Sequence, residues 1–239
     1  MPRPAVRLFD VEFSWRRNGF SLRVPSFSVE RGRKVLLTGS SGAGKSTLLN
    51  LICGTVPAQQ GAVEVLGKNL ATLSRTKRDR FRAERIGVVF QMFNLVPYLS
   101  IIDNVLLPLR FAPERARRAR AGGGEGNEAQ RLLTALALDP SLHRRPVTEL
   151  SVGQQQRVAA ARALIGGPEL VIADEPTSAL DQDRQAAFLS LLFGELAAIG
   201  ATLVMVSHDV RLAAQFDAVV RLDSIASTSD GSGIRGVDA

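Results

Sequence analysis

Short apolar runs alternate with helix-like segments along most of this chain. Such runs, bounded by glycine or by polar residues, are typical of buried strands in a parallel sheet. The strands expected on this basis cover residues 34–38, 63–66, 86–90, 170–173, 202–206 and 219–222. Residues 45–53 have a helical pattern that ends at Gly54, and residues 75–85 have a polar helical pattern.

Between residues 94 and 166 the pattern becomes helical, interrupted by a glycine-rich segment, 122–126, that we expect to be a flexible loop. Strand–helix units before and after this region predict an α/β core with an inserted helical subdomain. We place the core at residues 1–90 and 166–223 and the insert at residues 91–165. The segment 224–239 is rich in Ser, Gly and Asp, which predicts a disordered tail.

Composition limits the class of protein further. The 239 residues suit one large domain, or a core with one insertion, and 45% hydrophobic residues are enough for a full core. No apolar run is long enough to span a bilayer, and the first residues lack the apolar region of a signal peptide. We therefore expect a cytosolic protein. Cys53, the single cysteine, lies in an apolar stretch and is expected in the core.

The net charge of +7 comes mostly from arginine, concentrated in residues 75–85 and 115–120. Two interpretations are open for these basic runs. They can be solvated helix faces, or they can attract phospholipid headgroups or a partner protein.

The strongest chemical signal follows the strand expected at 34–38. The sequence there matches G-x-x-x-x-G-K-[ST], the phosphate loop of P-loop NTPases, between a strand and a helix. Its glycines let backbone N–H groups turn toward an anion, the lysine reaches the β- and γ-phosphates, and the hydroxyl of Ser46 can bind Mg²⁺. The candidate nucleotide-binding residues here are Gly39, Ser40, Ser41, Gly42, Ala43, Gly44, Lys45, Ser46 and Thr47.

Two later predicted strands are also followed by acidic residues or a histidine. The run 170–173 leads into Asp174, suited to holding Mg²⁺, and Glu175, placed to activate the attacking water. The run 202–206 leads to His208, which can contact the γ-phosphate. Because ligands of such sheets bind at the carboxyl ends of the strands, these groups are expected to converge with the phosphate loop. The catalytic candidates are Lys45, Glu175 and His208.

A group of further motifs resembles the ABC-type ATPases. The segment 150–164 resembles their signature motif and the helix after it, 178–181 their D-loop, and Phe90-Gln91 their Q-loop. The resemblance implies a P-loop NTPase core of RecA-like type, mostly parallel with an antiparallel N-terminal β region. It also implies that Trp15, Gln91, Ser151, Gly153, Gln154 and Asp181 bind ATP, and that Mg²⁺ is held by Ser46, Gln91 and Asp174.

In that family, two copies pack head to tail, and each ATP lies between one copy's phosphate loop and the other's signature. The resemblance therefore implies a homodimer that closes on ATP and drives a separate membrane permease at the cytoplasmic face of the inner membrane. Val152 stands where the usual signature has glycine. Because a β-branched residue disfavours positive φ, we expect ordinary backbone geometry at Val152.

Residues 89–105 and the Gln154–Arg157 run look most like the lipoprotein-releasing and macrolide-export branch, which implies extraction or mechanical transmission. We expect the apolar loop 93–98 to receive the permease. A non-transport ABC protein acting on nucleic acid or in signalling is the alternative, and an ATP sensor without hydrolysis is another. The long coiled coil or second core of the nucleic-acid classes is absent from the sequence, and Glu175 argues against a pure sensor.

Overall fold

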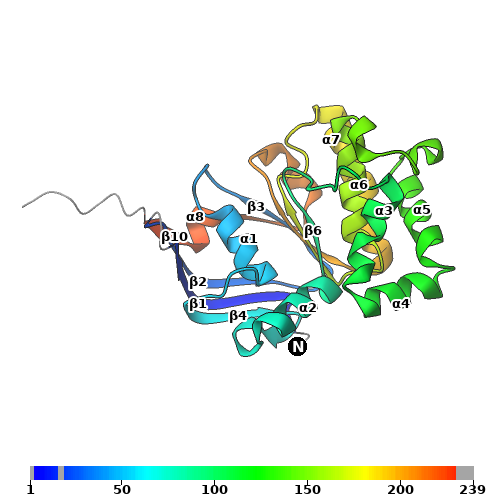
Figure 1. The fold of residues 1–239 in the computed structure, drawn as a ribbon. Helices are drawn as coiled ribbons and strands as arrows, with labels where there is room; N and C mark the ends of the chain where they lie inside the picture. The colour runs from blue at the N-terminus through cyan, green and yellow to red at the C-terminus, as the bar shows by residue number, and fades with distance from the viewer. Residues whose placement is uncertain (1–2, 16–18, 230–239) are drawn as a thin grey trace, which may run out of the picture.

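The computed structural model describes residues 3–15 and 19–229, which form two five-stranded sheets (Figure 1). The antiparallel sheet has the spatial order β10 (Ser227–Ser229), β2 (Ser21–Val29), β1 (Val6–Ser14), β4 (Gln60–Val65) and β5 (Lys68–Asn69). The parallel sheet has the order β6 (Ile86–Val89), β7 (Leu170–Asp174), β8 (Thr202–Val206), β3 (Lys34–Thr38) and β9 (Ala218–Arg221). The predicted α/β fold, with its antiparallel N-terminal region, is confirmed.

The helices fall into two groups (Figure 1). Those associated with the sheets are α1 (Lys45–Cys53), α2 (Arg75–Arg85), α7 (Gln182–Ile199) and α8 (Leu222–Ile225). Those between β6 and β7 gather on the side of the molecule away from the antiparallel sheet and are α3 (Ile101–Leu106), α4 (Pro113–Ala121), α5 (Glu125–Ala135) and α6 (Val152–Leu164). Short 3₁₀ turns cover Leu70–Thr72, Leu107–Arg110, Pro140–Leu142, Val147–Glu149 and Val210–Gln215.

The parallel sheet divides the interior into two cores. Since side chains alternate along a strand, Leu36 of β3 packs with the helical group, whereas Val35 and Leu37 pack toward α1 and the antiparallel sheet. Helix α6 is at the centre of its group, where it contacts α3, α5, α7 and β6. Its buried face is rich in alanine, and this lets neighbouring elements approach closely.

The strand register places the carboxyl ends of β7, β8 and β3 side by side. Val206 of β8 pairs with Asp174 of β7 on one side and with Leu37 of β3 on the other. The segments that follow these strands therefore leave the sheet at one edge. This is the physical reason why motifs far apart in the sequence can share one site.

The predicted disordered tail is wrong for its first residues. Ile225 and Ala226 are partly buried against the core between the sheets, and Ser227–Ser229 adds β10 to β2. These apolar contacts outweigh the polar composition of the segment. The remaining residues of the predicted tail, 230–239, lie outside the described residues.

Two other expectations change. Helix α5 begins at Glu125, so the glycine-rich connection ends at Gly124 rather than at residue 126. Within the basic run 115–120, Arg115 is not solvated: it is 2% exposed and donates hydrogen bonds to the carbonyls of Ala163 and Ile165. Its burial satisfies the backbone at the end of α6, where helical carbonyls lack partners.

Candidate functional site

The phosphate loop joins the end of β3 to the start of α1. Gly42 and Gly44 adopt positive φ angles of 80° and 91°, which other residues rarely tolerate. A Cβ atom on Gly44 would also lie 2.9 Å from the ring of Phe20. Helix α1 has no side-chain cap at its start, so its first N–H groups are free to bind an anion.

Lys45 stretches across this loop. Its Nζ atom donates to the carbonyl oxygens of Gly39 and Ser40, both at 2.8 Å. An ammonium group held at two neutral carbonyls can exchange them for phosphate oxygens, which bind it more strongly.

The acidic end of β7 faces α1. Ser46 Oγ donates to Asp174 Oδ2 at 2.9 Å. Burial, opposed by this hydrogen bond, raises the pKa of Asp174 above its usual range, and the neighbouring Glu175 carboxylate raises it further. Two oxygen donors of the kind that Mg²⁺ prefers therefore lie together at the base of the phosphate loop.

Glu175 has a positive φ of 44°, an unusual conformation for a residue with a side chain. Its N–H donates to the carbonyl of Val206, which fixes the turn to β8. His208 Nδ1, which follows β8, donates to Glu175 Oε2 at 2.8 Å. The strained turn thus brings the acid and the histidine of two neighbouring strands into direct contact.

The phosphate loop, Trp15 and the end of β7 enclose a cleft of about 410 Å³. Trp15 Nε1 donates to Thr47 Oγ1 at 3.2 Å, and its ring stands edge-on to Phe13. Trp15 as a residue is 37% exposed and lines the cleft. The residues that line the cleft are Trp15, Phe20, Ser41, Gly42, Gly44, Lys45, Ser46, Thr47, Gln91, Asp174 and Glu175.

A second cleft, of about 510 Å³, lies at the start of α6. Ser151 caps this helix: its Oγ accepts from the N–H of Gln154, and Gln154 Oε1 accepts from the N–H of Ser151. Val152 occupies the first helical turn without a positive φ, as its side chain predicts. Ser151, Val152, Gly153, Gln154 and Arg184 are among the residues that line the cleft.

No residue lines both of these clefts in the described part of the chain. The structure therefore brings most of the predicted loop, metal and water-activating residues together, and leaves Ser151, Gly153 and Gln154 apart from them. Gly39, Ser40 and Ala43 belong to the loop backbone without lining the cleft. Asp181 caps α7 by accepting from the N–H of Arg184, beside the second cleft.

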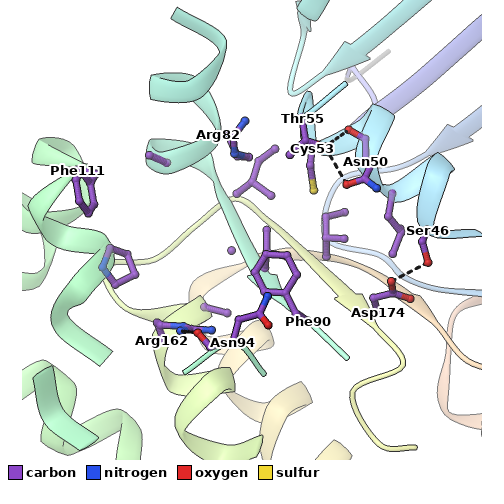
Figure 2. Close-up of a pocket in the computed structure, with 18 of the residues that line it drawn as sticks. Ser46, Asn50, Cys53, Thr55, Arg82, Phe90, Asn94, Phe111, Arg162 and Asp174 are labelled. Carbon is purple, nitrogen blue, oxygen red and sulfur yellow. Dashed lines mark hydrogen bonds between the residues drawn. The ribbon is translucent and has the colours of Figure 1, made fainter. Parts of the chain in front are cut away.

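A groove of about 410 Å³ is lined by residues of α1, α2, β6 and the helical group (Figure 2). Phe90, Pro108 and Phe111 contribute apolar surface to it, and Arg162 and Asn94 lie close together there (Figure 2). Sequence reasoning missed this groove and the buried residues around it. A usable signal was Arg162 itself, a charged residue in the otherwise apolar end of α6.

The loop 93–98, which we expected to receive the permease, is not exposed at its first residue. Phe93 is 8% exposed and packs into the core of the helical group, whereas Met92 and Tyr98 are 81% and 85% exposed. The reason is a tight turn in which Phe93 and Asn94 both adopt positive φ, and this reverses the direction of the side chains. Between residues 3 and 229, leaving out 16–18, no helix has the length and apolar character to cross a membrane.

Comparison with known proteins decides the family. The sequence profile of the ABC transporter family matches residues 22–178, more than half of the chain. The chain belongs to the ABC transporter family. This agrees with the resemblance seen in the motifs and confirms the expected class, an ATPase subunit of a transporter.

Relatives of two architectures are found within the ABC transporter family. The uncharacterized ABC transporter ATP-binding protein YbbA of Escherichia coli K12 is 41% identical over 81% of this chain and 82% of its own length. The macrolide export ATP-binding/permease protein MacB of Campylobacter jejuni is 40% identical over 87% of this chain but 31% of its own length. The chain is thus similar to most of an ATP-binding protein and to about a third of a protein named for ATP-binding and permease functions.

A solved ABC structure is also similar. An ATP-binding cassette in a dimeric, post-hydrolysis state bound to ADP and Pi superposes with a TM-score of 0.78. It is 33% identical, and the match covers 90% of this chain and 93% of that one. Sequence and fold therefore agree over nearly the same residues.

Proposed function

We propose that this chain binds ATP with Mg²⁺ in the cleft between Trp15 and Glu175 and hydrolyses it to ADP and phosphate. The observation that carries the proposal is the meeting of the phosphate loop with the Asp174–Glu175 turn, where Glu175 contacts His208. The Trp15 ring stacks on adenine, the loop N–H groups hold the β-phosphate, and Lys45 moves from its carbonyl partners to the β- and γ-phosphate oxygens.

The residues at the end of β7 fit a Mg²⁺ site. Ser46 and Asp174 offer a hydroxyl and a carboxylate oxygen 2.9 Å apart, and Gln91 lines the same cleft. A site with few protein ligands suits Mg²⁺, which keeps waters and phosphate oxygens around it. When bound, the ion supplies positive charge that stabilises the leaving phosphate oxygens.

Glu175 acts as the general base for the attacking water in this proposal. Its side chain lies at the cleft, the hydrogen bond from its N–H to the carbonyl of Val206 fixes the backbone turn, and His208 holds the carboxylate. The histidine holds the carboxylate and approaches the γ-phosphate, and Gln91 helps to orient the water.

The signature cleft is the other half of the site. The start of α6, with Ser151, Gly153 and Gln154, offers N–H groups and a hydroxyl to an anion but has no water-activating residue among the described residues that line it. We assign it to the γ-phosphate of ATP held by a second copy, with Asp181 beside the junction. Support comes from the separation of the two clefts within one chain and from the dimeric state of the similar ADP-bound cassette.

We further propose that the dimer works on a membrane permease of the macrolide-export type, at the cytoplasmic face of the membrane. The groove of Figure 2 and the exposed Tyr98 and Phe111 form the docking surface. Similarity to a protein named for ATP-binding and permease functions supports the pairing. Nucleic acid is not an expected partner.

Glu175→Gln tests the catalytic proposal. The amide keeps the shape of the side chain but cannot take a proton, so hydrolysis should fall by about 10²–10⁴-fold, while ATP binding remains. The same variant should elute as a dimer in ATP and as a monomer without it. A variant that hydrolyses ATP at the wild-type rate would show that Glu175 is not the base.

The docking proposal is tested with Tyr98→Glu and Phe111→Glu. Both side chains are exposed and lie outside the nucleotide cleft, so basal hydrolysis should remain. Stimulation by a reconstituted permease should be lost because a charge replaces apolar contact area. Unchanged stimulation in both variants would exclude this surface, and Arg75→Glu, at an exposed position of α2, serves as the matched surface control.

A further inference from the structure

We infer that Arg162 is a positioning residue that links the signature helix α6 to the loop carrying Gln91, so that the two halves of the site move together. The inference rests on the proposed function, because it gives Gln91 and Ser151 their roles. Neither the phosphate loop nor the signature includes Arg162.

The link is a direct contact between elements far apart in the sequence. Arg162 lies near the end of α6, and its guanidinium donates to the carbonyl of Asn94 at 2.7 Å and to that of Phe93. The residue is 9% exposed. Within the described residues it has no carboxylate partner, so these two carbonyls take the place of water around the buried charge.

The carbonyls that Arg162 holds belong to a strained turn. Phe93 and Asn94 have φ angles of 58° and 50°, side by side. Asparagine tolerates this region, but for a bulky residue such as Phe93 it is an outlier that needs support from its surroundings. The planar guanidinium matches both carbonyls at once, which a lysine ammonium cannot do with the same geometry.

The far end of the same loop is also fastened to the helical group. Asn104 of α3 is fully buried, and its amide accepts from the N–H of Val96 and donates to the Val96 carbonyl. The segment 93–96 is therefore carried by α3 and α6, while Gln91, just before it, lines the nucleotide cleft of the core.

A displacement of α6 must consequently shift the loop at Phe93 and Asn94, and with it Gln91. In the proposed dimer, the start of α6 binds the partner's γ-phosphate. Arg162 thereby makes the position of Gln91 depend on whether the signature end of its own helix is occupied. Loss of the link should impair hydrolysis and leave nucleotide affinity intact.

The test compares Arg162→Lys and Arg162→Met with Arg118→Lys. The methionine keeps the packing of the side chain without a buried charge. Arg118 is the matched control because it donates to the carbonyl of Gly166, just beyond the same helix, at 2.7 Å and lines neither the groove nor the two clefts. Nucleotide affinity is read from the fluorescence of Trp15, the single tryptophan.

Both Arg162 variants should lose at least about tenfold in kcat with the Kd for ATP within about twofold of wild type. Hydrogen exchange of the segment 92–96 should rise, and the Arg118 control should change neither quantity. A kcat within about twofold of that control, or unchanged exchange, overturns the inference. If wild-type protein does not hydrolyse ATP, the proposed function fails, and the exchange measurement still decides the link.

A second measurement needs no change at Arg162. In Glu175→Gln, ATP-driven dimerisation should protect the first turn of α6 and the segment 92–96 from hydrogen exchange over the same ATP concentration range. Protection of α6 without protection of the loop contradicts the link, even if both Arg162 variants prove unstable.

Discussion

The nucleotide cleft and the signature cleft each lie where a helix begins. They differ in whether a side chain caps the first N–H groups of that helix. Gly44 leaves the start of α1 without a side-chain cap. Ser151 and Gln154 cap the start of α6 reciprocally. The first site is thus open to a phosphate, whereas the second must share or release a cap when an anion arrives.

Their chemical contents differ as well. The nucleotide cleft combines a lysine, an acid pair, a glutamine and an aromatic ring drawn from both sheets. The signature cleft is formed by the helical group and the start of α7. The described residues that line it offer hydrogen-bond donors to an anion but no carboxylate that could act as a base. In the proposed function, one cleft holds the nucleotide and activates water, and the other completes the site. The proposed reaction therefore calls for two chains.

The largest expected effect comes from inactivating the nucleotide cleft in one chain and the signature cleft in another. Lys45→Ala and Ser151→Ala should each lower hydrolysis by about 10²-fold or more, through loss of charge and of anion donors respectively. Mixing the two variants should restore activity, because the mixed dimer keeps one intact composite site. Turnover is measured against the ratio of the variants. Mixtures of Lys45→Ala with Glu175→Gln are the matched control, since both changes lie in the nucleotide cleft and no mixed dimer then has an intact site.

Absence of recovery at every mixing ratio would contradict the two-chain site. Ser151→Ala alone should still bind ATP normally as a monomer, measured by Trp15 fluorescence. Lys45→Ala alone should not. This contrast assigns binding to the first cleft and completion to the second.

A next prediction concerns pH and the metal end of the first cleft. Since burial raises the pKa of Asp174, the native state takes up its proton more readily than the unfolded chain. Ionised Asp174 therefore costs stability, and this cost grows as pH rises from the unfolded pKa to the folded one. Asp174→Asn should melt at a higher temperature than wild type at about pH 7 without Mg²⁺, and the difference should shrink in acid.

The same substitution should remove Mg²⁺-dependent hydrolysis, and lowering the pH should weaken the apparent Mg²⁺ affinity of wild type. Steady-state turnover measures the hydrolysis, and thermal unfolding with and without Mg²⁺ across pH measures the apparent Mg²⁺ affinity. Ser151→Ala, which alters the other cleft, should leave the pH dependence of Mg²⁺ binding unchanged. A melting temperature of Asp174→Asn below that of wild type near neutral pH would contradict the assignment.

A smaller effect, on ATP affinity, is expected at Trp15 in the nucleotide cleft. Trp15→Ala should weaken ATP binding about tenfold, since stacking on an aromatic ring contributes about 1–3 kcal/mol per base. Calorimetric titration with ATP and with inorganic triphosphate measures it, because triphosphate has no base to stack. Equal weakening for both ligands would exclude stacking.

The smallest effect is expected at Val152, which is 49% exposed at the start of α6. Since Val152 already has ordinary backbone geometry, Val152→Gly should alter kcat by only about twofold, the size of a typical surface substitution. Steady-state hydrolysis measures it, with ATP affinity of the monomer as the control. A change of about tenfold or more would show that the valine limits signature function.

Several features followed from the sequence because their cause is local. Glycine at positive φ, the helix after Gly44 and the acids after an apolar strand are written in adjacent residues. Val152 was correctly expected in ordinary backbone geometry for the same reason. The limits of the expected strands shifted by at most three residues, as local patterns allow.

Other features could not be predicted because their cause is remote. Phe93 belongs to the loop that was expected to receive the permease, and a strained turn held by Arg162 buries it. The segment 224–239 was expected to be disordered, and contacts with β2 order its first residues. In each case contacts with distant parts of the chain, rather than local composition, decide whether the segment is buried or ordered.

The sequence by itself determined the phosphate loop, the class of nucleotide chemistry and the identity of the groups at each strand end, because these depend on residue type and short spacing. Only the tertiary structure decided which groups meet. The register of β7, β8 and β3 joins Asp174, Glu175 and His208 to the loop, while α6 holds Ser151 in a separate cleft. That separation is a property of packing, which no local pattern contains.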